Sequence, residues 1–145
     1  MPSMDQDDIY SLKRFVLIQE GIFKTVRKEL RLGKKHTHWM WFVFPQYKGL
    51  GVSQMAHNYA IQSMDEARAY LNHPVLGGRL IECVGLAIAC GKNADEIFGY
   101  PDNLKFRSSM TLFNEAHNSE IIFHEALIHL CDGNKDQLTL DLLAG

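Results

Sequence analysis

Three stretches of the sequence carry polar side chains that could bind or transform a small molecule. The first is the loop 46–53, where Gln46 and Lys48 stand beside Gly49 and Gly51. Glycines let backbone N–H groups approach an anion, and a lysine adds positive charge. The spacing matches neither the phosphate-binding Walker loop nor the dinucleotide fingerprint. Two interpretations therefore stand, an anion-binding turn and simple turn chemistry.

The second stretch, 102–111, contains Asp102, Lys105, Ser108 and Ser109. If it is helical, Lys105 and the two serines share one face, because residues three and four apart are neighbours. A lysine beside two hydroxyls suits a phosphate or a carboxylate. It could also pair a serine nucleophile with a lysine base, although the Ser-x-x-Lys order of penicillin-recognising enzymes is reversed here. The alternative is a solvated helix face with Asp102 as its N-cap.

The third stretch, 38–46, places His38, Trp39, Trp41 and Gln46 within one aromatic string. Flat aromatic rings stack on bases or sugars, and a buried indole N–H needs a hydrogen-bond partner. Aromatic residues that cluster in sequence also build cores. We therefore expect at least one of the two tryptophans to belong to the core.

Two further polar residues have structural explanations. Gln19 lies on an apolar stripe, where its amide is expected to hold the core together rather than to line a pocket. Glu66 completes a Ser63-x-x-Glu66 capping box, which accounts for it without acid–base chemistry.

Metal, disulfide and cofactor chemistry have no motif in this sequence. The seven histidines lack ligand spacing and matched carboxylates, so we expect no metal. The cysteine number is odd and no Cys-x-x-Cys pair exists, which favours reduced thiols in the core. No cofactor is expected. The three cysteines are Cys83, Cys90 and Cys131.

The composition limits which classes of protein this chain can belong to. Fifteen basic and seventeen acidic side chains in 145 residues give a net charge of −2, which argues against a dedicated nucleic-acid binder but allows a local basic patch. The acidic first eight residues do not form a signal peptide, and the apolar stretch 83–90 is too short for a membrane span. We expect a cytoplasmic protein without membrane contact.

Helices must position these side chains. Apolar residues recur at steps of three and four from Leu12 to Leu30, which predicts one helix that stops at Gly33. The aromatic string 38–46 is interpreted as a short buried helix, because no second strand of similar quality follows it. Further helices are expected at 53–62, 63–72, 74–91 and from 101 onward, with a break at Asn118-Ser119 and one or two more helices after it. Asn93 to Glu96 repeats the capping pattern and is expected to lead into a short turn that ends at Gly99.

The predicted fold class is all-α: a compact multihelical single domain of about seven to eight helices with short loops. This domain would span residues 1–145, with flexible ends.

Several motifs in fixed order closely resemble the family catalogued as domain of unknown function 1810. The resemblance covers about residues 8–130, with Val43 where the family usually has isoleucine. It implies a multihelical single domain and no established activity, substrate or catalytic residue. Some members carry a calpastatin label, but a chain with this many periodic apolar residues does not suit an extended, disordered inhibitor. The motifs are the string 38–46, Gly49-Leu50-Gly51, Glu66-Ala67, Tyr70-Leu71, His73 to Gly77, Ile97-Phe98-Gly99, Asp102, Lys105 and Ser108 to Phe113.

The leading functional hypothesis is binding of a nucleotide-like or other anionic small molecule in a pocket between helices, with hydrolysis of that ligand as its enzymatic version. The alternative is a non-enzymatic protein–protein interaction module. A concave pocket that joins the aromatic string to Lys105 would favour the first, and a flat apolar patch the second. The candidate ligand-binding residues are His38, Trp39, Trp41, Gln46, Lys48, Asp102, Lys105, Ser108 and Ser109.

Overall fold

The computed structural model describes residues 8–116 and 120–145, and these residues form ten helices and no strand. The all-α, single-domain prediction is confirmed, although the helices are more numerous than expected because several are short. In chain order they are α2 (Lys13–Glu20), α3 (Phe23–Leu32), α4 (Met40–Val43), α5 (Gln54–Asn58), α6 (Met64–Asn72), α7 (Leu76–Ala89), α8 (Ala94–Phe98), α9 (Asp102–Ala116), α10 (Ile122–Leu130) and α11 (Gln137–Ala144).

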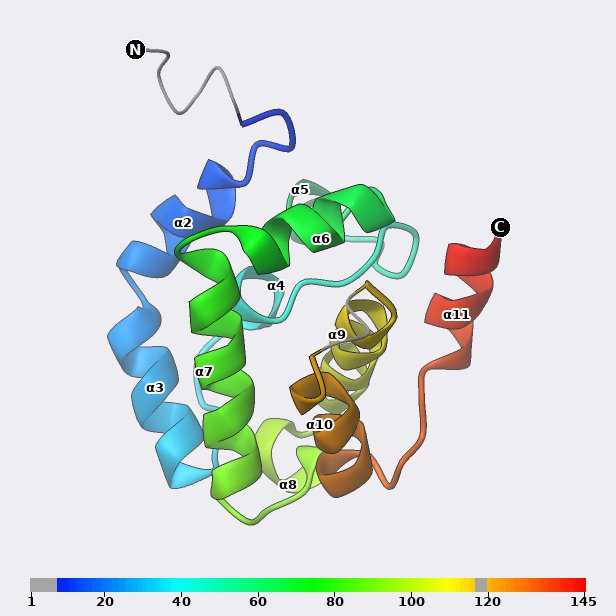
Figure 1. Cartoon of the computed structure of the whole chain (residues 1–145). Coiled ribbons are helices and arrows are strands. Elements are labelled where there is room, and N and C mark those ends of the chain that lie inside the picture. The colour runs from blue at the N-terminus through cyan, green and yellow to red at the C-terminus, as the bar shows by residue number, and fades with distance from the viewer. Residues whose placement is uncertain (1–7, 117–119) are drawn as a thin grey trace.

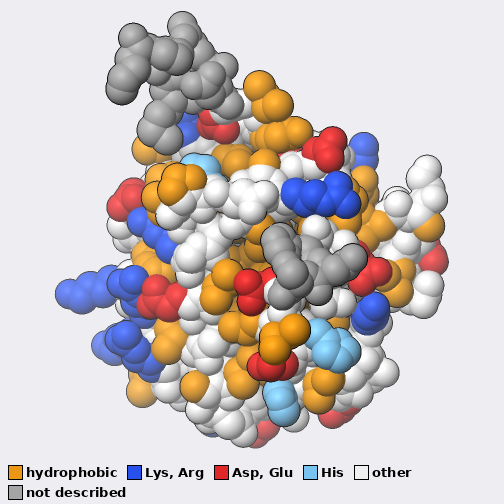
Figure 2. All heavy atoms as spheres, viewed as in Figure 1, with side chains coloured by type: hydrophobic (Ala, Val, Ile, Leu, Met, Phe, Trp, Pro, Cys, Tyr) orange, Lys and Arg blue, Asp and Glu red, His pale blue; other side chains and the backbone are white. Residues whose placement is uncertain are grey.

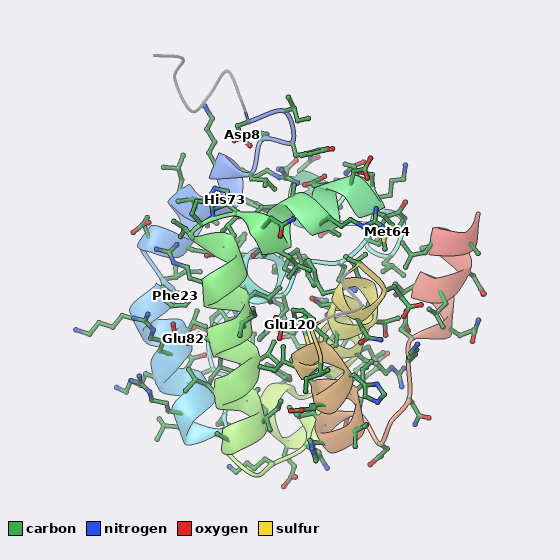
Figure 3. The ribbon with its side chains drawn as sticks, viewed as in Figure 1. Asp8, Phe23, Met64, His73, Glu82 and Glu120 are labelled. Carbon is green, nitrogen blue, oxygen red and sulfur yellow. The ribbon has the colours of Figure 1, made fainter. Side chains whose placement is uncertain are left out.

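Helices α7 and α9 form the centre of the fold (Figure 1). Helix α7 packs against α3, α6 and α10, while α9 packs against α6, α8, α10 and α11. The contact between α3 and α7 carries both apolar and charged groups: Figure 3 shows Phe23 and Glu82 along it, and Arg27 donates to Glu82 at 2.6 Å. None of the described helices has the length and apolar character to cross a bilayer.

The aromatic string enters the core through α4, as the short-helix interpretation predicted. Phe44 follows this helix and is fully buried, with its ring 5.1 Å from Phe106 and 5.8 Å from Phe98, centroid to centroid. Edge-to-face pairs of this kind contribute beyond simple area burial. The string therefore connects the N-terminal helices to α9.

The prediction of one helix from Leu12 to Leu30 is wrong, because the chain bends at Gly21 and Ile22. Ile22 leaves the helical region with φ −124° and ψ −12°, so α2 ends and α3 begins in a new direction. The bend lets α2 pack on α4 while α3 packs on α7. Apolar spacing continues across the bend, so periodicity alone could not reveal it.

Helix α5 also ends earlier than predicted, at Asn58 rather than near Gln62. Backbone pairing competes with the helix here: Ile61 N–H donates to the Gln46 carbonyl at 2.8 Å, and Lys48 N–H donates to the Ile61 carbonyl at 2.9 Å. This short parallel bridge holds the loop after the aromatic string against the segment before α6.

The helix caps agree with the sequence signals. Ser53 and Ser63 accept from the backbone at the starts of α5 and α6, and Asn93 with Glu96 forms a full capping box on α8. Gly33 and Gly91 follow α3 and α7 with φ of 71° and 78°, a region that favours glycine. The expected break at Asn118-Ser119 lies outside the described residues.

Candidate functional site

Two adjoining pockets of about 690 and 490 Å3 open on the described surface. Both are lined by Trp41, Gln46, Gly51 and Ala56, so they are two lobes of one hollow. We call the whole the Trp41 groove, with a larger and a smaller lobe. Its walls come from α4, the loop 46–53, α5, the start of α9, and α11.

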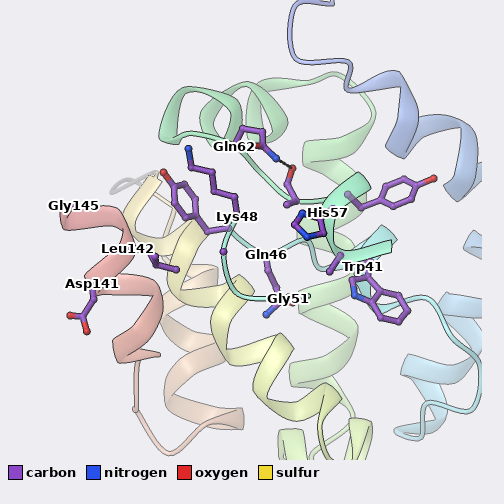
Figure 4. A pocket seen from close by; sticks show the side chains of 14 residues that line it. Trp41, Gln46, Lys48, Gly51, His57, Gln62, Asp141, Leu142 and Gly145 are labelled. Carbon is purple, nitrogen blue, oxygen red and sulfur yellow. Dashed lines mark hydrogen bonds between the residues drawn. The ribbon is translucent and has the colours of Figure 1, made fainter. Parts of the chain in front are cut away.

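The larger lobe has the more polar lining of the two (Figure 4). Lys48, His57 and Gln62 line it together with Gln46, and Leu142 of α11 approaches the loop from the other side. Gln62 is held by a 3.4 Å hydrogen bond to the Ala60 carbonyl. Lys48 is exposed and forms no ion pair with any other residue that the structure describes, so its ammonium can contact a ligand.

The smaller lobe is more apolar and centres on the Trp41 ring. The Lys105 Nζ lies 4.3 Å from the centroid of that ring, a cation–π contact. Ser108 also lines the lobe, but its hydroxyl is bonded to the Thr139 hydroxyl at 2.9 Å. Leu50, Val52, Leu104 and Leu138 complete the wall.

A chain of charges continues behind the smaller lobe. Asp102 Oδ1 accepts from Lys105 at 3.2 Å, and Asp102 Oδ2 lies 2.7 Å from the Nζ of Lys35. The Lys35 side chain is only 6% exposed. Sequence reasoning missed this residue, because a lysine in a short polar linker carries no signal of burial.

Of the nine candidate residues, five line the Trp41 groove. They are Trp41, Gln46, Lys48, Lys105 and Ser108. The aromatic string and the stretch 102–111 thus meet at one hollow, although sixty positions separate them. Asp102 reaches the groove through its contact with Lys105. Ligand binding by these residues stays a prediction.

The other three candidates do not line the groove. His38 is exposed on the turn before α4. Ser109 is fully buried in the body of α9, and its hydroxyl has no hydrogen-bond partner within residues 8–116 and 120–145. Trp39 is 2% exposed and belongs to the core. Adjacent helix residues point in different directions, which separates Ser109 from Ser108.

The indole of Trp39 has a buried partner. Its Nε1–H donates to Glu29 at 2.9 Å, and the same carboxylate accepts from the backbone of His36 and from both the backbone and hydroxyl of Thr37. Burial alone would raise the pKa of Glu29, but these hydrogen bonds outweigh it and lower the pKa below its usual value. Glu29 is therefore held as a carboxylate.

Gln19 has a structural role, as expected. Its amide donates to the Phe42 carbonyl at 2.7 Å and to the Tyr70 hydroxyl at 3.2 Å, which ties α2 to α4 and α6. Both side chains are buried. Burial raises the pKa of Tyr70 above its usual range, so the phenol stays protonated.

Glu66 has a structural role, as expected, but its carboxylate binds the backbone N–H of Gln62 rather than that of Ser63. Ser63 accepts from the Glu66 backbone at 3.0 Å, while the Glu66 carboxylate binds the Gln62 N–H at 2.9 Å and Arg14 at 2.8 Å. Arg14 also donates to four backbone carbonyls, those of Tyr10, Ser11, Asn58 and Ala60. This arginine, another residue that the sequence did not single out, fixes the chain that lines the larger lobe.

Neither the lysine and serine of the groove nor the cysteines elsewhere in the fold are arranged for nucleophilic catalysis. Lys105 bonds to Asp102 and Ser108 to Thr139, so the lysine and serine are not joined as base and nucleophile. Burial raises the pKa of the Cys83 and Cys131 thiols to about 12, which makes them poor nucleophiles at neutral pH. No cluster of three metal-ligating side chains occurs in the described part of the chain.

A separate basic surface lies along α3, away from the groove. Figure 2 shows Lys and Arg side chains gathered at its left edge, where Figure 1 places α3. Lys24, Lys28 and Arg31 are exposed there at steps of four and three residues. The small net charge therefore conceals a local basic patch.

Comparisons with known proteins match nearly the whole chain. A family model described as a protein of unknown function (DUF1810) matches residues 9–143, which extends beyond the 8–130 region expected from motifs. The crystal structure of the conserved hypothetical protein Rv1873 from Mycobacterium tuberculosis is similar, with 49% identity and a TM-score of 0.92. The similarity covers 95% of this chain and 99% of that one. No curated protein matched the chain.

Proposed function

The chain belongs to the DUF1810 family of proteins of unknown function, and from this premise we propose that it binds a nucleotide-like or other anionic small molecule in the Trp41 groove. One observation carries the proposal. The groove joins an indole ring, a glutamine and two lysines from separate parts of the chain around a single hollow.

The size and lining of the groove support a small-molecule ligand. Each lobe falls within the roughly 300–1,000 Å3 typical of ligand pockets. Trp41 supplies an aromatic edge for a flat ring, while Lys48 and Lys105 supply positive charge on either side of Gln46. A ligand with both a ring and an anionic group would use both lobes.

Binding has more support than hydrolysis. A hydrolase needs a general base or a nucleophile within hydrogen-bond reach of its partner, and the groove's lysine and serine are each bonded elsewhere. His57 is the side chain of the larger lobe best suited to proton transfer. We therefore propose a binding function first.

The interaction-module alternative also has a supporting observation. The rim of the smaller lobe includes Val52, Leu138 and Leu104, which are 96%, 56% and 39% exposed. Exposed apolar side chains around a hollow can receive a protein partner as well as a small ligand. The concavity of the groove favours the small molecule.

A thermal-shift screen tests the proposal. Nucleotides, sugars and phosphorylated metabolites are added to the protein, and a true ligand at one hundred times its Kd stabilises the fold by about 2.7 kcal/mol. The shift should shrink in Trp41→Ala and in Lys48→Ala. It should persist in Lys28→Ala, which removes an exposed lysine of α3 far from the groove. A panel without a hit, or equal shifts in all three variants, would contradict the proposal.

A further inference from the structure

We propose that the buried Lys35 makes the smaller lobe selective for an oxyanion, by neutralising Asp102 and leaving the positive charge of Lys105 available to a ligand. The inference rests on the proposed function of the Trp41 groove and names the group that its ligand must carry. That group is a phosphate or a carboxylate, bound by Lys105 beside the Trp41 ring.

The geometry of the three charges supports this assignment. Each oxygen of the Asp102 carboxylate faces one lysine, with Lys35 at 2.7 Å and Lys105 at 3.2 Å. Two ammonium groups on one carboxylate leave a net charge of +1. Lys105 is the member that lines the lobe, and its side chain is 24% exposed.

Lys35 is the member that must keep the carboxylate. Its side chain is 6% exposed, its Nζ lies 5.3 Å from the Trp39 ring centroid, and its backbone N–H donates to the Ile97 carbonyl at 2.8 Å. A buried ammonium without a counter-ion is strongly unfavourable. Asp102 therefore remains paired with Lys35, and the Lys105 ammonium can leave Asp102 to contact a ligand.

The acidic side chain that lines the smaller lobe is already bonded within the chain. Asp136 lines the smaller lobe, but its carboxylate accepts from the backbone and the hydroxyl of Thr139 at the start of α11. The positive end of that helix partly balances the Asp136 charge. Lys105 is thus the lobe's strongest centre for an incoming anion. Lys35 acts through it as a positioning residue.

A double-mutant cycle on Lys35 and Asp102 tests the inference. The affinity for inorganic pyrophosphate, used as the probe, is measured at low ionic strength. The triad has a net charge of +1 in the wild type, 0 in Lys35→Met, +2 in Asp102→Asn and +1 in the double variant. Pyrophosphate affinity, measured by calorimetry and by the shift of the Trp41 indole N–H resonance, should fall in Lys35→Met and rise in Asp102→Asn. Each change should be about threefold to tenfold, and the double variant should return near the wild type.

The two single variants are expected to change pyrophosphate affinity in opposite directions, which distinguishes an electrostatic role of Lys35 from a structural one. A purely structural Lys35–Asp102 pair would weaken binding in both single variants, and that result would overturn the inference. Lys28→Met removes the same charge from α3 and should leave the affinity unchanged, while Lys35→Arg keeps the charge and should bind like the wild type. If Lys35→Met unfolds, Asp102→Asn against the wild type decides. If Asp102→Asn unfolds because it leaves the buried Lys35 without a counter-ion, Lys35→Met against the double variant decides, since only a charge effect is reversed by removing Asp102 as well.

Two further results would also contradict the inference about Lys35. Absence of pyrophosphate binding in all proteins, including Asp102→Asn, would overturn the assignment of the oxyanion. A ligand from the screen that binds the groove equally in all four proteins would overturn this inference while the proposed function stands.

Discussion

Glu29 shows how one buried carboxylate can organise a whole segment of chain. Its two oxygens accept from the Trp39 indole, from two backbone N–H groups and from the Thr37 hydroxyl, and the side chain as a whole is buried. Hydrogen bonds to a charged acceptor are stronger than neutral ones. The residue therefore fixes the turn between α3 and α4, and with it the direction in which the aromatic string enters the core.

The lowered pKa of Glu29 predicts an acid-sensitive stability. A carboxylate whose pKa is depressed by folding stabilises the protein above its unfolded pKa, and that stabilisation is lost as pH falls through the folded pKa. Glu29→Gln should lower the free energy of unfolding at pH 7 by about 1–3 kcal/mol. As the pH falls below 4.5, the ordinary glutamate pKa, Glu29→Gln should lose less stability than the wild type.

Urea denaturation from pH 7 down to pH 3 measures this difference. Glu96→Gln is the control, because Glu96 is exposed and belongs to the α8 capping box. Parallel pH profiles for the wild type and Glu29→Gln would show that Glu29 is not held as a carboxylate by its surroundings.

At the scale of elements, the close packing of α6 against α7 requires a glycine at the start of α7. A Cβ on Gly77 would lie 2.0 Å from the Leu71 carbonyl oxygen, which belongs to the backbone and cannot move aside cheaply. Gly77 is buried in the first turn of α7. The two helices can therefore approach closely only because residue 77 is glycine.

This close approach predicts that Gly77→Ala is destabilising. The variant must push α6 and α7 apart, and overpacking of this kind costs about 1–3 kcal/mol or more. Gly78→Ala is the matched control, since nothing lies within 4 Å of a Cβ there. That control should be neutral or more stable by up to about 1 kcal/mol, because alanine favours the helix. Equal melting temperatures for the two variants would contradict the close contact.

At the scale of the whole molecule, the Trp41 groove has one weakly anchored wall. Within α11, all of which the structure describes, Thr139 alone is buried, whereas α7 buries six residues. Figure 1 shows α11 at the edge of the molecule beside α9. Its polar anchors are the Ser108–Thr139 hydroxyl pair and the Asp136 N–H bond to the Thr111 hydroxyl.

Few buried contacts predict early local opening. In hydrogen-exchange mass spectrometry, peptides from α11 should exchange well before those from α7 and α10. Thr139→Ala should accelerate exchange in α11 without changing α7. Exchange of α11 at the same rate as α7 would show that this helix opens only with the whole fold.

Several features of the fold and the groove could be predicted from the sequence. Ser53, Ser63 and Asn93 cap helices because their side chains act on backbone groups two or three residues away. The short buried helix in the aromatic string was also predictable, as was the burial of Gln19. The resemblance to the family rested on the same local motifs.

Other features depended on contacts between distant parts of the chain. The bend at Gly21, the end of α5 at Asn58 and the hidden partners Lys35 and Arg14 all follow from packing that no local pattern records. The split between Trp39 and Trp41 is the clearest case. Two residues apart in one string, one bonds to Glu29 in the core and the other meets Lys105 at the surface.

The sequence by itself determined that this chain folds into one helical domain, because helix caps and apolar spacing act over a few residues. Only the tertiary structure decided which polar groups meet around the Trp41 groove. The Lys105 ammonium, for example, is paired with Asp102, and Asp102 is paired in turn with Lys35, seventy positions away from Lys105. Electrostatic and packing energies depend on distance in space, and only the folded chain sets that distance.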